Sequence, residues 1–348
     1  MYQKALFVLS IVRFENDSGN EFYGAAFVLL ASGYVCCTLL AGLIGLLLLL
    51  NLRCTQKWLH NVTKGNTLTP DTAGLIFVGG HPSSGTGLMR VMLDAHPLIR
   101  CGAEPLVTFD LLKIRHSKND QWKRVAKEAG VYPEVYDHAV AAFILKVIEE
   151  MGPSAEYLCH KEPVTTPYFK YLAFLFPKAK FVHMLRDGRG VVASSIARHL
   201  IVGGKGNETE LALRQWETMV KTIMQDCNDI GPDRCITIRY EKLVLESELE
   251  MKKLFKFLHI PWDSIVLRHE TVLENLTHLN PFEPSTKQFM MKIHPHSLGK
   301  WSRLKENMNE EFLRTADKSI HLLHDLGYSD VGYPPDYSRL PANLPELT

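Results

Sequence analysis

The chain has 348 residues, which is enough for one large domain or two ordinary ones with a substantial core. Its 39 Lys and Arg residues balance 38 Asp and Glu residues, and a net charge of +1 gives no electrostatic case for nucleic-acid binding. The 15 histidines lack ligand spacing such as H-x-x-x-H, so we expect no metal site.

A long uncharged stretch near the N-terminus is the first predicted element. Phe22 to Leu52 contains no charged residue, and its apolar centre exceeds the about 20 residues that a membrane-spanning helix needs. A buried soluble helix and a cleaved signal peptide are the alternatives, but the run is too long and starts too late for a usual signal peptide. We expect an uncleaved transmembrane signal anchor over 22–52, preceded by a short cytosolic tail over 1–21.

The orientation of this anchor is predicted from cysteines and sequons, because Lys and Arg flank it on both sides. Four cysteines fall in the expected folded part, an even number that suits disulfides in an oxidising compartment: Cys101, Cys159, Cys227 and Cys235. Three candidate glycosylation sites follow the anchor, at Asn61, Asn207 and Asn275, and a fourth at Asn16 would be silent. We therefore expect a single-pass type II membrane protein with a lumenal domain.

Beyond the anchor, a polar stem over 53–71 leads to a domain over 72–332 in which apolar runs and helical periodicity alternate. Short apolar runs predict buried strands at 75–79, 157–160, 180–185 and 235–239. Helical spacing predicts helices over 88–94, 139–150, 167–176 and 211–226. This alternation predicts an α/β fold with a parallel sheet covered on both faces. The proline-rich residues 333–348 are expected to form an extended tail on the surface.

The loop between the first predicted strand and helix has the spacing of a phosphate-binding loop. Gly80 and Gly85 give G-x-x-x-x-G, a pattern that lets backbone N–H groups converge on an anion at a helix N-terminus. The next residues are Thr86 and Gly87 instead of Lys and Ser or Thr, and no Walker-B acidic residue is evident. The loop therefore suits an anion other than a Mg-bound triphosphate, such as a sulfonate donor. A plain Gly-Ser turn is the alternative.

Longer motifs around this loop give a more specific indication than its glycine spacing alone. The stretch VGGHPSSGTGLMRVMLDAHPLIRCGAE resembles the opening motif of the Golgi protein-tyrosine sulfotransferases, in which a P-R-S-G-T-T loop is followed by L-M-R-x-M-L-D-A-H-P and R-C-G-E-E. The similarity continues in the same order through CHKEP, LFPKAKFVHMLRDGR, YEKLVL, PST-K-Q, LGKW and LGYSDVGYPPDY. The resemblance implies the P-loop-like fold of sulfotransferases that use 3′-phosphoadenosine 5′-phosphosulfate (PAPS), with a parallel sheet flanked by helices.

The resemblance also implies a reaction, the transfer of a sulfonate group from PAPS to tyrosine hydroxyls of secretory-pathway proteins. A phenol with an ordinary pKa of about 10 needs a base, and Glu104 stands where the family has its catalytic glutamate. Lys161 matches the lysine that stabilises the leaving group, and Ser285 matches a supporting serine. A surface role for Glu104 and a solvated charge at Lys161 are the plain alternatives.

Donor binding and two disulfides are implied in the same way. The residues expected to bind the donor are Ser83, Ser84, Gly85, Thr86, Gly87, Arg186, Ser194, Arg198, Tyr240 and Lys300. Among these, Arg186, Ser194 and Arg198 would hold the 3′-phosphate. The segment 285–294 would close over the nucleotide. The expected disulfides join Cys101 to Cys159 and Cys227 to Cys235, and a homodimer is expected from the resemblance alone.

The sequence departs from the family pattern at the donor loop and at the acceptor site. Ser83 replaces the loop arginine and Gly87 a threonine, and each lost charge-assisted hydrogen bond is worth about 1.5–3 kcal/mol. A protonated His81 would offset part of this loss. Leu106 and Asp110 replace arginines that receive acidic residues beside the target tyrosine, so recognition of acidic peptides is expected to be reduced or altered.

Three hypotheses follow from these features. The first is an active Golgi tyrosine sulfotransferase with a shifted acceptor preference. The second is a PAPS-binding homologue with weak or no activity, and the third is a sulfotransferase with another acceptor such as a carbohydrate. Retention of Glu104, Lys161 and Ser285 favours the first, whereas Ser83 and the missing arginines favour the second.

Overall fold

The computed structural model describes residues 7–15, 21–29, 68–117, 119–201, 207–272, 279–283, 286–303 and 308–344. The chain divides into two compact units, Met1–Thr67 and Leu68–Thr348. Ser285, Asn61 and Asn275 lie outside the described residues, and so does most of the predicted stem.

The N-terminal unit contains an antiparallel pair of strands. β1 (Phe7–Glu15) pairs with β2 (Glu21–Leu29), from Phe7 opposite Leu29 to Glu15 opposite Glu21. Their aromatic and β-branched side chains favour pleated strands, so the helix predicted to begin at Phe22 does not begin there. Residues 30–52 of the predicted anchor lie outside the described part. Within the described residues, no helix combines the length and apolar character needed to cross a membrane.

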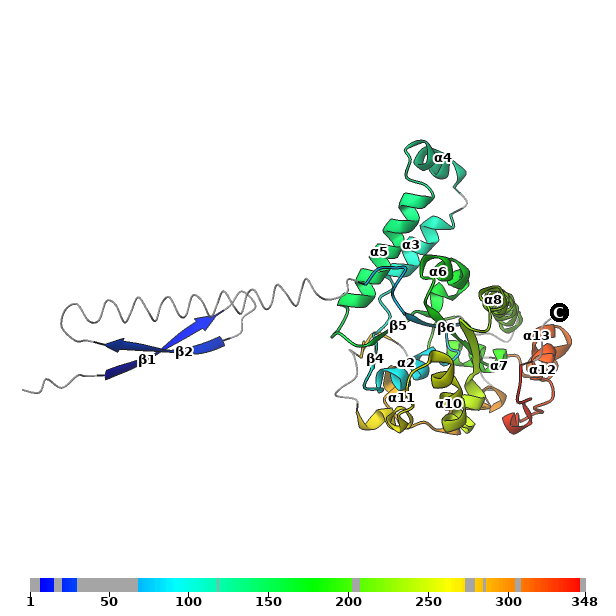
Figure 1. Ribbon diagram of the computed structural model, residues 1–348. Coiled ribbons are helices and arrows are strands. Elements are labelled where there is room, and N and C mark those ends of the chain that lie inside the picture. The colour runs from blue at the N-terminus through cyan, green and yellow to red at the C-terminus, as the bar shows by residue number, and fades with distance from the viewer. Residues whose placement is uncertain are drawn as a thin grey trace, which may run out of the picture. The chain divides into compact units, whose positions relative to one another are not determined.

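The C-terminal unit is built on a five-stranded parallel sheet in the order β4-β5-β3-β6-β7 (Figure 1). Its strands are β3 (Ile76–Gly80), β4 (Ile99–Cys101), β5 (Tyr157–Lys161), β6 (Lys180–Leu185) and β7 (Cys235–Arg239). Four of them confirm the strands predicted from apolar runs. The short β4 was not predicted, because three residues are too few to show a pattern.

Alternating side chains of the central strands enter two different cores. Phe77 of β3 and Phe181 of β6 pack with helices on one face, as stacked rings 5.3 Å apart between centroids. Those helices are α5 (Glu134–Glu150), α6 (Phe169–Leu175) and α8 (Glu208–Ile230). On the other face, Ile76 and Val78 pack against α2 (Thr86–Asp94) and α10 (Ser247–Leu258). Both faces are therefore covered, as the continuous apolar runs predicted.

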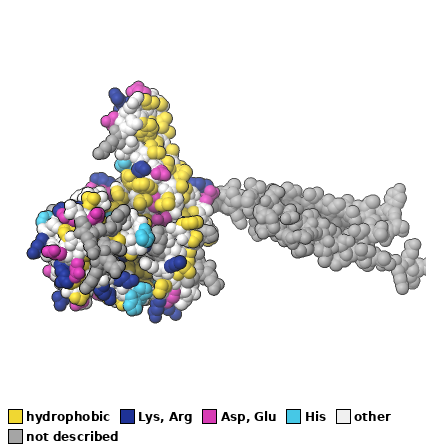
Figure 2. Space-filling view, turned by 180° about the vertical axis from the view of Figure 1, so that it is seen from behind, with side chains coloured by type: hydrophobic (Ala, Val, Ile, Leu, Met, Phe, Trp, Pro, Cys, Tyr) yellow, Lys and Arg dark blue, Asp and Glu magenta, His cyan; other side chains and the backbone are white. Residues whose placement is uncertain are grey.

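Three helices form an arm that projects from the sheet (Figure 1). They are α3 (Val107–Arg115), α4 (Asp120–Glu128) and the N-terminal part of α5, and α4 buries none of its residues. Figure 2 shows hydrophobic side chains gathered along this arm. The large apolar residues exposed on the arm and its connections are Ile114, Val125, Val131, Val135 and Phe143. Burial in the arm thus decreases outward, from Leu112 of α3, which is buried, to α4, which buries no residue.

The remaining helices are short and follow the strands or the C-terminal segment. They are α7 (Gly188–Ala197), α9 (Tyr240–Leu245), α11 (Thr286–Phe289), α12 (Glu310–Arg314) and α13 (His321–Asp325), with 3-10 turns at Pro163–Tyr168, Ser264–Thr271, Pro295–Ser297, Lys300–Arg303, Ala316–Lys318 and Tyr337–Arg339. α7 begins two residues after β6, beyond Arg186 and Asp187, and α9 begins directly after β7, so the carboxyl ends of these strands lead into helices.

The proline-rich C-terminal segment contributes to the core instead of lying only on the surface. Tyr337 is 5% exposed, and its hydroxyl donates to Asp187 Oδ2 at 3.0 Å. The Trp301 indole donates to the Tyr337 oxygen at 2.8 Å. Leu340 is buried as well. The prediction of a surface tail is therefore wrong for these residues, because composition alone does not reveal which aromatic side chains of a proline-rich segment fill a core.

The order of the strands creates a natural binding position at the end of β3. The chain builds β4 and β5 on one side of β3 and then crosses to build β6 and β7 on the other. Ligands of parallel sheets bind in the crevice at the carboxyl ends of strands where the strand order reverses. The loop that follows Gly80 stands at this point.

Candidate active site

The loop between β3 and α2 has the backbone geometry of an anion cradle. Ser83 and Gly85 both have positive φ values, 76° and 103°. A side chain on Gly85 would also overlap the Tyr240 ring, so both the backbone conformation and the lack of space favour glycine there. Because the first N–H groups of α2 have no partner within the helix, they are available to an anion. Ser84 adds a buried hydroxyl that has no hydrogen-bond partner among the described residues.

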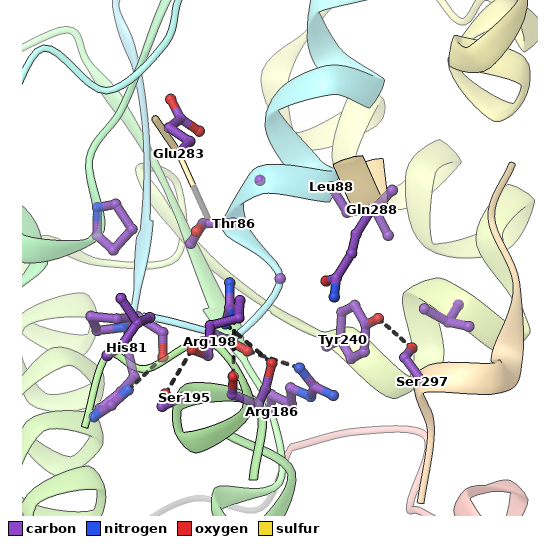
Figure 3. Close-up of a pocket in the computed structure, with 18 of the residues that line it drawn as sticks. His81, Thr86, Leu88, Arg186, Ser195, Arg198, Tyr240, Glu283, Gln288 and Ser297 are labelled. Atoms are coloured by element: carbon purple, nitrogen blue, oxygen red, sulfur yellow. Dashed lines mark hydrogen bonds between the residues drawn. The ribbon is translucent and has the colours of Figure 1, made fainter. Parts of the chain in front are cut away.

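The loop is fixed in place by groups that follow β6. Ser83 Oγ lies 2.7 Å from Ser195 Oγ on α7, and the Arg186 guanidinium donates to the Ser83 carbonyl at 2.9 Å. Both residues lie beside the loop in Figure 3. Arg186 also lies over the Tyr240 ring, 4.4 Å from its centroid. These contacts hold the Arg186 guanidinium next to the anion cradle, although the loop itself contains no Lys or Arg.

A second guanidinium lies close to Arg186. Arg198 Nη2 donates to Ser194 Oγ at 3.1 Å, as their spacing on one helix predicted. Burial, with the positive charge of Arg186 as a further cause, lowers the pKa of Arg198. Arg186 is buried and Arg198 half-buried, and an anion between two cations that repel each other stabilises both. This pair therefore forms a credible phosphate site.

These groups line one cavity of about 990 Å³ (Figure 3). The predicted site residues that line it are Ser83, Gly85, Thr86, Gly87, Glu104, Arg186, Ser194, Arg198, Tyr240 and Lys300. Part of the segment expected to close over the nucleotide also lines it, including Gln288, Met291 and His294. Residues from far apart in the sequence thus meet at one cavity at the carboxyl end of the sheet.

Glu104 and Lys161 are in direct contact. Lys161 Nζ, at the end of β5, donates to Glu104 Oε1 at 2.5 Å. The same ammonium donates to Glu283 Oε2 at 3.0 Å, and Glu283 Oε1 accepts from the Glu104 backbone N–H at 2.8 Å. Lys161 is 1% exposed, whereas the Glu104 side chain is 25% exposed and reaches the cavity. The predicted base and the predicted leaving-group cation are thus neighbours at one edge of the cavity.

Two further buried ionisable groups, Arg90 and Glu162, lie near this pair. The Arg90 guanidinium donates to the Cys101 carbonyl at 2.8 Å, and burial lowers its pKa while Asp94, Glu283 and Glu104 oppose that shift. Glu162 accepts a short hydrogen bond from the Thr108 hydroxyl, and burial raises its pKa to about 7. The pocket edge therefore carries a compact set of charges with little solvent access.

The predicted disulfides are confirmed. Cys101 and Cys159 are bonded, with their Cα atoms 4.4 Å apart, and they join β4 to β5. Glu104 follows the first strand and Lys161 ends the second, so this bond connects the two segments that carry the proposed base and cation. Cys227 and Cys235 are also bonded and join α8 to β7.

His81 does not fill the role suggested for it. Its ring lines the cavity and bonds to the Pro82 carbonyl at 2.8 Å. Burial lowers its pKa, with the bond to Pro82 opposing that shift in part. A lowered pKa disfavours the protonated ring at mildly acidic pH, so His81 does not replace the loop arginine as a cation.

The segment that follows Glu104 exposes apolar side chains. Leu106 is 57% exposed at the start of α3, and Val107 is 47% exposed. Phe109 and Val164 line the cavity next to Glu104. The Asp110 side chain is 76% exposed and lies 3.8 Å from Lys113. This surface offers no arginine to an acidic peptide at the two positions where the family has one.

The sequence reasoning missed several residues that complete the site. Glu283 was not predicted, although it directly precedes the recognised PST-K-Q motif. Ser195 and Ser297 also line the cavity, and Ser297 Oγ lies 2.7 Å from the Tyr240 hydroxyl. Their proximity to recognised motif residues was the available signal, but single polar residues in loops carry no spacing pattern.

Comparisons with known proteins agree with this geometry. Residues 76–264 match the family described as the sulfotransferase family. The chain is 37% identical over 270 residues to a protein-tyrosine sulfotransferase of Drosophila melanogaster, which covers 76% of this chain and 54% of that protein. It is 39% identical over 270 residues to protein-tyrosine sulfotransferase 2 of Gallus gallus, covering 76% and 72%. It is 38% identical over 279 residues to protein-tyrosine sulfotransferase 1 of Homo sapiens, covering 79% and 75%.

Solved structures support the fold. The sulfotransferase domain of a Synechococcus olefin synthase superposes with a TM-score of 0.50 at 22% identity, over 70% of this chain and 91% of that one. The sulfotransferase domain of the curacin biosynthetic pathway gives a TM-score of 0.51 at 20% identity, over 72% and 98%. At these identities the likeness concerns the fold alone.

Proposed function

Because the chain belongs to the protein-tyrosine sulfotransferase family, we propose that it transfers a sulfonate group from PAPS to tyrosine hydroxyls of proteins. The observation that carries this proposal is the convergence of the loop, the two guanidiniums and the Glu104–Lys161 pair on one cavity. The chain covers about half of the Drosophila relative, so acceptors and activity are proposed for this chain on its own residues.

The donor fits the residues that are present. The N-terminus of α2 suits the 5′-phosphosulfate, and Arg186, Ser194 and Arg198 suit the 3′-phosphate. Ser84 is buried in the same loop but is not among the described residues that line the cavity. Tyr240 and Lys300 would complete the nucleotide site. When bound, PAPS supplies an activated sulfonate group. The tasks left to the protein are to position the acceptor, take a proton and balance the charge that develops on the leaving group.

Glu104 is placed to act as the base. Its carboxylate is the part of the Glu104–Lys161 pair that reaches the cavity, where a tyrosine hydroxyl would enter. Proton transfer to a positioned carboxylate contributes typically about 10²–10⁴-fold to a rate. Lys161 lies beside it as a buried cation and would stabilise negative charge on the leaving nucleotide. Ser285, outside the described residues, is proposed to support Lys161.

Two features distinguish this chain from the family pattern, and the first favours the second hypothesis, a weakly active or inactive homologue. The loop has no cation at Ser83, and Gly87 lacks a hydroxyl. The apolar acceptor side favours acceptors with neutral flanking residues over acidic ones. We therefore propose a tyrosine sulfotransferase with a shifted acceptor preference. Transfer to a carbohydrate hydroxyl would use the same donor site and is the further alternative.

The cellular setting is proposed from the sequence and the disulfides. Two disulfides suit an oxidising compartment, in keeping with a domain in the Golgi lumen. An anchor within residues 30–52, which contain no charge, would give the type II topology. Asn207, exposed at the start of α8, is the described candidate for glycosylation. A homodimer remains a prediction, which light scattering of the purified chain tests.

The proposed function is tested in two steps with the purified full-length chain. Binding of adenosine 3′,5′-bisphosphate is measured first by calorimetry. Transfer of radiolabelled sulfonate from PAPS is then measured with neutral and acidic tyrosine peptides and with a sulfate-acceptor oligosaccharide. We expect nucleotide binding and transfer to the neutral peptide. Binding without any transfer would support the inactive homologue, and transfer to the oligosaccharide alone would support the carbohydrate hypothesis.

A further inference from the structure

Glu283 differs from the other carboxylates near the cavity because both of its oxygens contact the proposed catalytic groups. Oε2 accepts from Lys161 Nζ at 3.0 Å, and Oε1 accepts from the backbone N–H of Glu104 at 2.8 Å. The residue itself is 7% exposed. One buried carboxylate therefore holds the side chain of the cation and the main chain of the base at the same time.

The charge balance of this cluster explains why a second carboxylate is needed. Lys161 is 1% exposed, and a buried ammonium requires an anionic partner. Glu104 provides one in the structure, at 2.5 Å. During the proposed transfer, a new bond forms between the phenolic oxygen and sulfur, the bond from sulfur to the 5′-phosphate oxygen breaks, and the phenolic proton moves to Glu104. Glu104 is then neutral and no longer balances Lys161.

We propose that Glu283 is a positioning residue that keeps Lys161 charge-balanced and in place while Glu104 turns to the acceptor and takes its proton. This inference rests on the proposed function and adds a second carboxylate to the Glu104–Lys161 pair. Glu283 needs no contact with substrate for this role. Because its oxygens hold Lys161 and the Glu104 backbone, its loss misplaces both groups together.

The same contact connects the catalytic pair to one wall of the cavity. The Glu283 carbonyl accepts from the Thr286 N–H at 3.0 Å, at the start of α11. Gln288 of α11, together with Met291 and His294, lines the cavity, on the side shown with Gln288 in Figure 3. The wall that faces the nucleotide is therefore attached through Glu283 to the lysine that faces the leaving group.

Three variants of the full-length chain test this role: Glu283→Ala, Glu283→Gln and the control Glu250→Ala. Glu250 is also 7% exposed and pairs with Lys253 at 2.6 Å, but it lies on α10 outside the cavity lining. We expect Glu283→Ala to lower kcat about 10²-fold, the effect of misplaced catalytic groups, with little change in KM or in adenosine 3′,5′-bisphosphate affinity. Glu283→Gln keeps an acceptor for the Glu104 N–H and should fall between Ala and wild type.

A second readout does not depend on turnover. Modification of Lys161 by an amine-reactive reagent, followed by mass spectrometry, should increase several-fold in Glu283→Ala and remain unchanged in Glu250→Ala. If the wild type transfers no sulfonate, the proposed function fails, and the labelling still decides the role of Glu283. Unchanged labelling of Lys161 in Glu283→Ala would overturn the proposal. A wild-type kcat in either Glu283 variant, in an active enzyme, would do so as well.

Discussion

At the residue scale, the site works with buried charges whose protonation is set by their surroundings. Glu162 is fully buried beside Lys161, and burial raises its pKa to about 7, with the Thr108 hydroxyl opposing that shift. His160 is buried beside it, and burial lowers its pKa to about 3. The strand end that presents Lys161 therefore carries a neutral imidazole and a carboxyl group that readily holds a proton.

The raised pKa of Glu162 gives a stability prediction. The folded state binds this proton more tightly than the unfolded state, whose pKa is near 4.5, so the stabilisation is full below that pH and is lost as pH rises through about 7. Glu162→Gln removes the titration. We expect the free energy of unfolding of the wild type, relative to the variant, to fall by on the order of 3 kcal/mol between about pH 5 and pH 8.

Urea denaturation of both proteins across this pH range measures the effect. His160 titrates in the unfolded state of both proteins, so it cancels in the difference. A wild-type-minus-variant difference that does not change with pH would show that Glu162 is ionised throughout and would contradict the assignment.

The missing cation in the loop gives a second prediction at this scale. Ser83 lines the cavity, its carbonyl accepts from Arg186, and its hydroxyl lies 2.7 Å from Ser195 Oγ, a contact that a longer side chain would give up. One charge-assisted hydrogen bond is worth about 1.5–3 kcal/mol, so Ser83→Arg should tighten binding of adenosine 3′,5′-bisphosphate about tenfold or more. Calorimetry measures the affinity, and Ser83→Gln controls for length without charge. Equal affinities of the Arg and Gln variants would rule out the loop as the donor site.

At the element scale, the strand–loop–helix junction positions the site, and Gly85 is its most constrained residue. Gly85 has φ 103° at the N-cap of α2, and a side chain there would overlap Tyr240. Gly231 has a similar φ of 91° at the end of α8, with no atom within 4 Å of an added side chain. A comparison of substitutions at these two glycines therefore distinguishes the effect of backbone strain from the effect of contact with the proposed donor site.

Alanine at each glycine is the corresponding experiment. Both substitutions should destabilise the fold by about 1–3 kcal/mol through backbone strain. Only Gly85→Ala should also weaken nucleotide binding, because it displaces Tyr240 and the guanidinium of Arg186 that lies over it. Thermal unfolding and calorimetry measure the two effects. Equal nucleotide affinities in both variants would show that the junction does not shape the donor site.

The elements that could be predicted from the sequence are those with a long or continuous pattern. The buried strands at 76–80 and 180–185 and the helix of α8 carry enough apolar residues to show their period. β4 is too short to do so, and the start of the membrane anchor was misplaced because a run of apolar residues does not distinguish a strand from a helix at its edge.

The site could be predicted where a motif carried its residues. Glu104, Lys161 and Arg186 were found from their motifs, and the structure brings them to one cavity or its edge. Glu283 could not be found in this way, since its role depends on a loop that returns to the sheet from 179 positions away. The failure of His81 as a cation depends on burial, which no local sequence pattern reports.

At the scale of the whole molecule, two disulfides and one parallel sheet hold the donor groups and the catalytic pair around a single cavity. The two proposed tasks, donor binding and proton transfer, belong to different residues. In the proposed function, the basic residues after β6 and the α2 N-terminus bind the nucleotide, and Glu104 with its apolar neighbours receives the acceptor. The central claim is that the Glu104 carboxylate takes the tyrosine proton in this arrangement.

The most direct test of that claim is the rate of radiolabelled sulfonate transfer from PAPS to a neutral tyrosine peptide, measured for the wild type and for Glu104→Gln under single-turnover conditions. Glutamine keeps the shape of the side chain but cannot take the proton. We predict a loss of about 10²-fold or more in the variant, with adenosine 3′,5′-bisphosphate affinity retained. A variant as fast as the wild type would contradict the account.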